Sequence, residues 1–139
     1  MLDLKKKILK ARKVRRYLMD NIEKENYNFF KIWNHRDDFN ETRITVIEKD
    51  EKYHEIALDI VYEENGCNIN LVVRELGFSE GYKANVENRL RNAGFNIIEE
   101  PKSVYNDKYH INLYELPEDV KCSEILEKVV SILDVLFKD

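Results

Sequence analysis

The sequence predicts one α+β domain, an antiparallel sheet with helices packed on it in the order α-β-β-β-β-α-β-β-α. Apolar residues recur at helical spacing near the start, middle and end of the 139 residues. Short runs rich in β-branched and aromatic residues lie between them, and Asn65-Gly66 separates two of these runs as in a tight hairpin. With only four Gly and two Pro, no flexible linker divides residues 1–139, which we expect to form a single domain.

The first segment predicts a helix from about Leu2 to Glu25. Its apolar stripe contains Leu4, Ile8, Ala11, Leu18 and Ile22. The opposite side carries cations: Lys5, Lys6, Lys10, Arg12, Lys13 and Arg16. Residues 1–16 hold eight Lys and Arg against one Asp, a net charge of +7, whereas the remainder carries −11. We therefore expect a basic amphipathic helix, residues 1–25, packed on an acidic body.

Phe29 to Trp33 and Thr42 to Ile47 are rich in residues that favour strands. The apolar residues from Tyr53 to Leu76 fit both the alternation of a strand and the spacing of a helix. As strands, His54 to Tyr62 and Cys67 to Arg74 flank Asn65-Gly66, whose tolerance of positive φ suits a hairpin turn. As helices, the same stretch has two apolar stripes, one on each side of that turn. Its β-branched and aromatic content favours the hairpin.

The last third predicts a helix from Glu80 to Ala93, capped by Ser79 and ended by Gly94. Two strands follow, Phe95 to Ile98 and Tyr109 to Tyr114, joined by a polar loop that contains Pro101, Ser103 and Asn106. A final helix has a broad apolar face, made by Ile125, Leu126, Val129, Ile132, Leu133, Leu136 and Phe137. That face must be buried in the domain or in a homodimer.

The predicted element order is similar to the fold of type III secretion chaperones, which also tend to be small and acidic. The similarity covers most of the chain. It is one of topology, with no shared motif, so it serves only as an analogy of fold.

The helical alternative for Tyr53 to Leu76 gives a second resemblance, to the winged helix-turn-helix family. Leu76-Gly77-Phe78-Ser79 matches the turn of that family, and Leu90-Arg91-Asn92-Ala93-Gly94 matches the end of its recognition helix. The resemblance implies that residues 95–114 form the wing and that a DNA groove is faced by Lys83, Asn85, Asn88, Arg89 and Arg91. Lys83, however, stands where the family has a buried aliphatic residue, and the wing would carry Glu99, Glu100 and Asp107, which repel phosphate. We therefore favour a helix that covers the sheet.

No catalytic signature is present: the chain has no Walker loop, GxGxxG, Gly-x-Ser-x-Gly or HExxH. His54 and His110 each close a Lys-Tyr-His triplet, but Ile56 and Asn112 stand where a phosphoesterase would carry hydroxyl residues. His35 lies near Asp37 and Asp38 in a segment typical of a solvated turn. We expect no enzyme activity, no metal and no cofactor, and we interpret Cys67 and Cys122 as reduced, mostly buried thiols.

These features favour a non-enzymatic binding protein, such as an inhibitor, immunity or chaperone-like module, with a protein or nucleoprotein partner. The acidic surface expected to meet a basic partner comprises Glu48, Asp50, Glu51, Glu63 and Glu64. The alternative is a winged-helix DNA-binding regulator that uses Lys83, Arg89, Arg91 and the basic helix, with a small hydrolase or nuclease as a third hypothesis. The first residues lack a signal-peptide pattern, and the longest uncharged stretch falls short of the ~20 residues of a membrane span. We therefore expect a cytoplasmic protein without a membrane partner.

Overall fold

A computed structural model describes residues 3–23, 29–34, 40–48, 55–74, 81–97, 102–105 and 108–137. The elements follow in the predicted order α-β-β-β-β-α-β-β-α. They are α1 (Leu4–Asn21), β1 (Phe29–Asn34), β2 (Glu41–Glu48), β3 (Glu55–Tyr62), β4 (Gly66–Arg74), α2 (Tyr82–Asn92), β5 (Lys102–Tyr105), β6 (Lys108–Pro117) and α3 (Cys122–Phe137). The predicted α+β class is confirmed.

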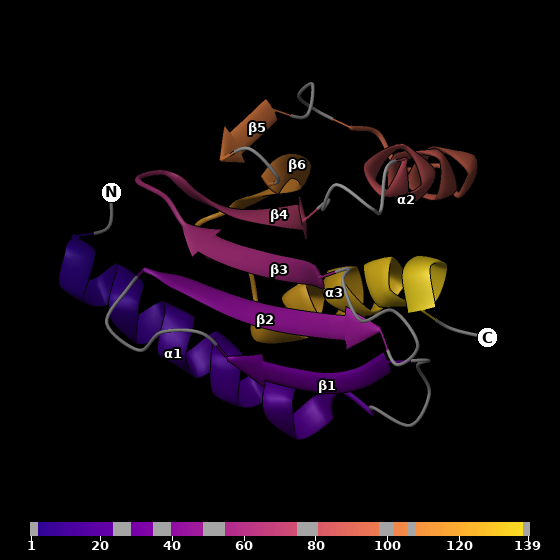
Figure 1. The fold of residues 1–139 in the computed structure, drawn as a ribbon. Helices are drawn as coiled ribbons and strands as arrows, with labels where there is room; N and C mark the ends of the chain where they lie inside the picture. The colour runs from indigo at the N-terminus through magenta and orange to yellow at the C-terminus, as the bar shows by residue number, and fades with distance from the viewer. Residues whose placement is uncertain are drawn as a thin grey trace.

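The six strands form one antiparallel sheet in the order β1-β2-β3-β4-β6-β5 (Figure 1). The first four strands pair with their neighbours in sequence, and β6 adds to β4 after the chain has passed through α2. A register shift between Ile69 and Asn70 interrupts the β4–β6 ladder. Because Gly66 pairs with Pro117 at one end of this ladder, the β3–β4 turn and the β6–α3 turn lie at the same end of the sheet.

Residues 55–74 form a β-hairpin, so the two-helix alternative for this stretch, and with it the winged-helix fold, is wrong. The predicted reason for the turn is also wrong. The amide of Glu63 donates to the carbonyl of Gly66 at 2.8 Å, so Glu64 and Asn65 occupy the turn, and no described non-glycine residue has a positive φ. Gly66 is needed for space instead, because a Cβ there would lie 2.8 Å from the carbonyl oxygen of Leu116.

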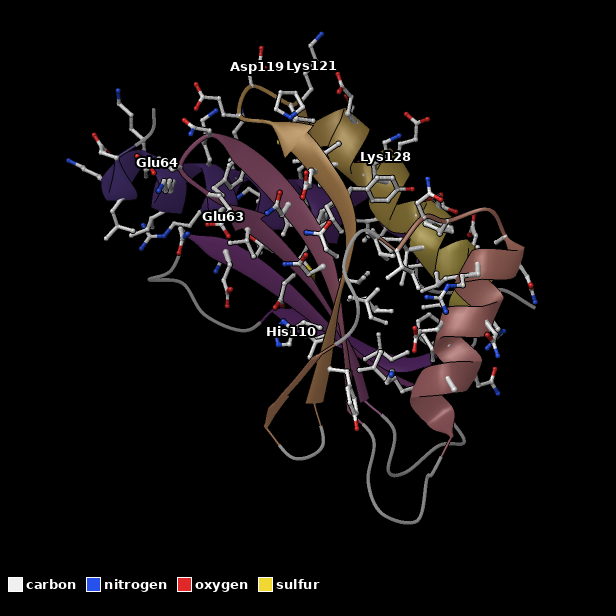
Figure 2. All side chains as sticks on the ribbon, turned by 90° about the horizontal axis from the view of Figure 1, so that it is seen from above. Glu63, Glu64, His110, Asp119, Lys121 and Lys128 are labelled. Atoms are coloured by element: carbon white, nitrogen blue, oxygen red, sulfur yellow. The ribbon has the colours of Figure 1, made fainter. Side chains whose placement is uncertain are left out.

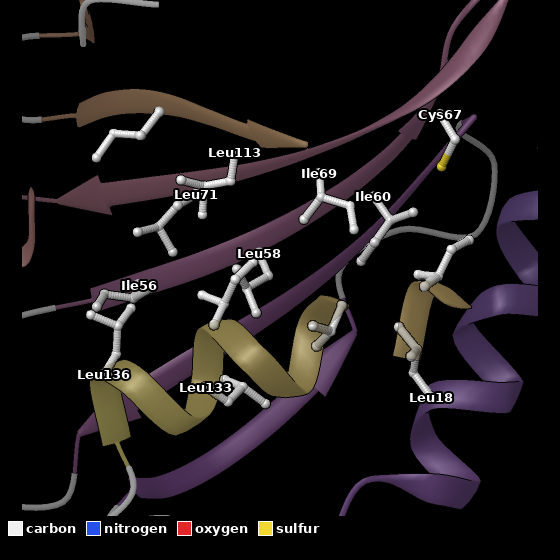
Figure 3. Close-up of a cluster of buried hydrophobic side chains, with 14 of the residues drawn as sticks. Leu18, Ile56, Leu58, Ile60, Cys67, Ile69, Leu71, Leu113, Leu133 and Leu136 are labelled. Carbon is white, nitrogen blue, oxygen red and sulfur yellow. The ribbon is translucent and has the colours of Figure 1, made fainter. Parts of the chain in front are cut away.

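The three helices share one core with a single face of the sheet. Alternate residues of β3 and β4 point into this layer, and Figure 3 shows Leu58 and Leu71 above Leu133 of α3. Leu58, Leu71 and Leu133 are fully buried. Burial of a large aliphatic side chain contributes about 1.5–3 kcal/mol relative to exposure, so this layer is the main source of stability.

The other face of the sheet carries a polar row across its centre. Asp59 of β3 pairs in register with Asn70 of β4, which pairs with Asn112 of β6. Each of these residues stands between core-facing neighbours, so its side chain points away from the helices. This alternation identifies which face of β3 and β4 the helices cover.

Helix α1 is shorter than predicted at both ends. Asp3 caps it by accepting a hydrogen bond from the amide of Lys6 at 2.9 Å. Its docked face contains Ala11, Val14 and Leu18. Leu4, whose spacing predicts the docked face, is exposed.

Helix α2 begins at Tyr82, and the position before it is Gly81 in the left-handed conformation (φ 90°) with no side-chain cap. The predicted cap, Ser79, lies outside the described residues. Gly94 follows the helix with φ 93°, as predicted.

The strand predicted at Phe95 to Ile98 does not form in the described residues up to 97. The Phe95 ring packs instead edge-to-face on Tyr114, with ring centroids 6.0 Å apart. The strand that precedes β6 and pairs with the edge of β6 away from β4 is β5, inside the stretch predicted as a polar loop. Pairing with the free edge of β6 outweighs the turn preference of residues such as Ser103.

Helix α3 buries its apolar face within the chain. Ile125, Val129, Ile132 and Leu133 are fully buried against the sheet and the other helices. Of the two alternatives for this face, burial in the domain is what the structure shows, and a homodimer is not needed to cover it.

Candidate interaction surface

The described members of the predicted acidic surface, Glu48, Glu63 and Glu64, lie at opposite ends of the sheet. Glu63 and Glu64 are exposed on the β3–β4 turn. Glu48 is the last residue of β2, beside the opposite end of β3, and Asp50 and Glu51 lie outside the described residues. Since β3 is 8 residues long, the two ends are roughly 23 Å apart. The structure brings Glu63 and Glu64 together and separates them from Glu48.

Two of the three basic residues predicted on α2, Lys83 and Arg91, share one carboxylate. Glu87 is buried (7% exposed) and forms ion pairs with Lys83 at 3.2 Å and Arg91 at 3.3 Å, each one helical turn away. Lys83 also lies over the Tyr109 ring, 5.0 Å from its centroid. Arg89 is exposed. The charges of Lys83 and Arg91 are therefore partly balanced within α2, which weakens any attraction of this helix for phosphate.

The basic residues of α1 are arranged differently. Most are exposed, namely Lys5, Lys6, Arg12, Lys13 and Arg16. Lys10 is turned toward the body: its Nζ donates to the carbonyl of Glu118 at 3.1 Å and lies 5.8 Å from the centroid of the Tyr62 ring. The solvent side of α1 is thus the main basic surface of the described chain.

Two leucines are exposed on α1, one of them, Leu9, within this basic surface. Leu4 is 62% exposed and Leu9 is 53% exposed, and they are the exposed large hydrophobic side chains of the described residues. A depression of about 350 Å³ runs beside them, lined by Leu4, Lys5, Ile8, Leu9 and Arg12. We call these five residues the basic-apolar face of α1.

The sequence contains a signal for this face. At 100° per residue, Leu9 falls between Lys5 and Lys13 and opposite the docked residues. The angle of Leu4 lies close to that of Ala11, which predicts burial, but Leu4 in the first turn of the helix is 62% exposed. A side chain in the first turn of a helix is buried only where another segment of the protein packs against that turn.

His110 is the histidine that the structure describes. It is half-buried on β6, on the side away from α2 and α3 (Figure 2), and pairs in register with Val72. His35 and His54 lie outside the described residues. Among the residues that the structure does describe, no group of three or more His, Cys, Asp and Glu side chains is placed to hold a metal ion.

The two cysteines are free thiols near Tyr62. Cys67 is fully buried, and burial raises its pKa from 9.0 to about 12. Burial also raises the pKa of Tyr62. Both groups are therefore neutral at physiological pH. Cys122 is half-buried at the first position of α3.

The helices in the described ranges do not combine the length and the apolar character that a bilayer span requires. The most apolar of them, α3, has 16 residues, whereas a span needs about 20.

Comparison of the chain with protein-family models, curated proteins and solved structures found no match.

Proposed function

We propose that this chain is a non-enzymatic binding protein that recognises an acidic protein partner through the basic-apolar face of α1. The observation that carries the proposal is the position of Leu9 in the middle of the cationic side, beside a depression that it shares with the exposed Leu4. Single exposed leucines are common on protein surfaces. Here, two leucines share one depression with Ile8 and two cations, which supports a role in docking.

The chemistry of the face defines the partner. Burial of Leu4 and Leu9 against apolar side chains would contribute about 1.5 kcal/mol or more each. Lys5 and Arg12 flank them on the same depression and would attract carboxylates, which speeds association and selects among partners. The partner segment should therefore carry apolar residues flanked by Asp or Glu.

A protein fits this face better than a nucleic acid does. Contacts to a phosphate backbone come from cations and hydrogen-bond donors, and leucines between the cations would remain unburied there. Lys83 and Arg91, two of the cations of α2 that the DNA-binding alternative uses, are paired with Glu87. Nucleic-acid binding is therefore an outcome of the test rather than a second proposal.

The test is affinity capture from the native lysate, with and without nuclease, followed by binding kinetics with the purified partner. Wild type is compared with Leu9→Ser and with Lys5→Glu. The matched control is Arg89→Glu, which makes the same charge change at an exposed position of α2. A fourth variant, Glu63→Lys with Glu64→Lys, tests the acidic turn. Co-sedimentation with vesicles that contain phosphatidylserine tests an anionic membrane surface.

The proposal predicts one protein that is retained stoichiometrically after nuclease treatment. Leu9→Ser should weaken its binding about tenfold or more, as expected for loss of one buried leucine contact. Lys5→Glu should slow association and reduce its salt dependence, and Arg89→Glu should change neither. Binding of nucleic acid or vesicles alone, without a protein partner, would overturn the proposal. A protein partner that still binds Leu9→Ser but no longer binds the variant with Glu63→Lys and Glu64→Lys would overturn it as well.

A further inference from the structure

A second hollow lies on a different side of α1 from the basic-apolar face. It has a volume of about 460 Å³, lies between α1 and the start of α3, and is lined among others by Lys10, Lys13, Tyr17, Tyr62, Lys121 and Cys122. We call it the α1–α3 cavity. Its volume falls within the range of small-molecule sites and far exceeds the roughly 30 Å³ occupied by one water molecule.

The charge of this lining is positive. Three ammonium groups, those of Lys10, Lys13 and Lys121, accompany one carboxylate, that of Asp119. Figure 2 shows Asp119 and Lys121 on the turn that leads into α3. The contacts of Lys10 with the Glu118 carbonyl and the Tyr62 ring hold it in place, whereas Lys13 and Lys121 are exposed. The lining therefore favours an anion.

The first turn of α3 adds to this field. The amides of Glu124 and Ile125 donate to the carbonyl of Lys121. Those of Cys122 and Ser123 have no partner inside the helix and form no backbone hydrogen bond with another described residue. The Lys121 side chain is a donor only and cannot cap them, so a bound acceptor would meet the lysines together with the positive end of the helix dipole.

The rest of the lining is apolar or neutral. Val14, Val120 and the ring of Tyr17 form the walls. Because burial raises the pKa of Tyr62, its hydroxyl stays protonated and adds no negative charge. A ligand with an anionic head and an apolar body matches this combination better than a bare ion does.

We propose that the α1–α3 cavity binds a small organic oxyanion, a carboxylate or phosphate carried on an aromatic or aliphatic body. The site uses residues outside the basic-apolar face, so it does not depend on the proposed function. The oxyanion is held by Lys13 and Lys121, and its body lies against Tyr17 and Val14.

The test follows amide chemical shifts of the full chain at constant ionic strength. The probes are benzoate and phenyl phosphate, which share the ring and differ in the oxyanion. Acetate and inorganic phosphate supply the heads alone, and benzyl alcohol supplies the ring without charge. The cavity variant is Lys13→Ala with Lys121→Ala, and Lys6→Ala with Arg89→Ala removes the same charge at exposed positions elsewhere.

The proposal predicts saturable changes of the amide chemical shifts at residues 13–17 and 120–123 with benzoate or phenyl phosphate. The ligand with the lower Kd identifies the preferred head group. The cavity variant should raise Kd about fivefold or more, the control variant should leave it unchanged, and Lys13→Arg with Lys121→Arg should retain binding. Acetate and inorganic phosphate should bind more weakly than the probes that carry the ring. Equal shifts with benzyl alcohol, equal weakening in the control, or no saturable shift at these residues would overturn the proposal.

Discussion

The hydroxyl of Thr42 donates a hydrogen bond to the carbonyl oxygen of Ala11, which joins β2 to the middle of α1. Both residues are buried, with exposed fractions of 2% and 1%. The bond helps to fix the rotation of α1 about its axis as well as its position. That rotation decides which side of α1 faces the sheet and leaves Leu9 on the solvent side.

Replacement of Thr42 by Val should therefore lower the free energy of unfolding. Valine keeps the volume and removes the donor, so the loss should be about 1 kcal/mol. Urea unfolding measures it. Thr42→Ser keeps the donor and should preserve most of the bond. Equal losses in both variants would show that packing of the methyl group, and not the hydrogen bond, holds α1.

Gly66→Ala should destabilise the sheet. The new Cβ would lie 2.8 Å from the Leu116 carbonyl oxygen, so β4 and β6 must separate locally at a cost of about 1–3 kcal/mol. Thermal unfolding provides the measurement. Asn65→Ala, at the exposed neighbouring position of the same turn, should change stability by less than about 0.5 kcal/mol. Similar small changes in both variants would contradict the close approach.

Leu133→Ala and Leu9→Ala should differ sharply although they remove the same atoms. Leu133 is fully buried, and its truncation should cost about 2–5 kcal/mol. Leu9 is 53% exposed, so its truncation should change stability by less than about 0.5 kcal/mol. Denaturant unfolding of both variants tests this. A large loss with Leu9→Ala would mean that Leu9 belongs to the core of the isolated chain.

The two thiols should react with alkylating reagents at different rates. Cys122 is half-buried and lines the α1–α3 cavity, whereas Cys67 is fully buried and neutral. Mass spectrometry after iodoacetamide treatment should find Cys122 modified in the native protein and Cys67 modified only after denaturation. Simultaneous labelling of both without denaturant would show that the start of β4 opens readily.

Stability should fall in alkaline solution. The folded pKa of Cys67 is raised from 9.0 to about 12, so the fold favours the neutral thiol. The stability that this pKa difference contributes is fully present below pH 9. It is lost as the pH rises from 9 toward 12, because in that range the thiol ionises in the unfolded chain but stays neutral in the folded one. Unfolding of wild type and Cys67→Ala at several pH values tests this. The variant should show a shallower decline above pH 9, and parallel curves would disprove the assignment.

Local patterns predict most of the elements. The helical spacing of Val86 and Leu90 and the apolar face that includes Ile132 identify α2 and α3 correctly, since one buried stripe suffices for an amphipathic helix. The β-branched run before Tyr62 likewise favours a strand, and the hairpin is confirmed. These signals depend only on residues close in sequence.

Contacts between distant segments explain what these patterns miss. Residues 102–105 become a strand because they pair with one edge of β6. The other edge of β6 pairs with β4, for example Val72 with His110, although α2 separates these two strands in the sequence. Phe95 is not part of a strand, and its ring packs on Tyr114. Neither the edge nor the ring contact is visible in local composition, so turn-forming residues such as Ser103 dominate the prediction.

For the candidate surface, charge and periodicity suffice to identify α1 as a basic amphipathic helix, because both are properties of neighbouring residues. Which apolar residues of that helix stay in solvent depends on tertiary contacts instead. Leu4 stays exposed in the first turn, and the bond from Thr42 to Ala11 helps to set the helix rotation. The exposure of Leu4 and Leu9 therefore follows from packing between segments that lie 31 residues apart in the chain, since only packed surface is removed from water.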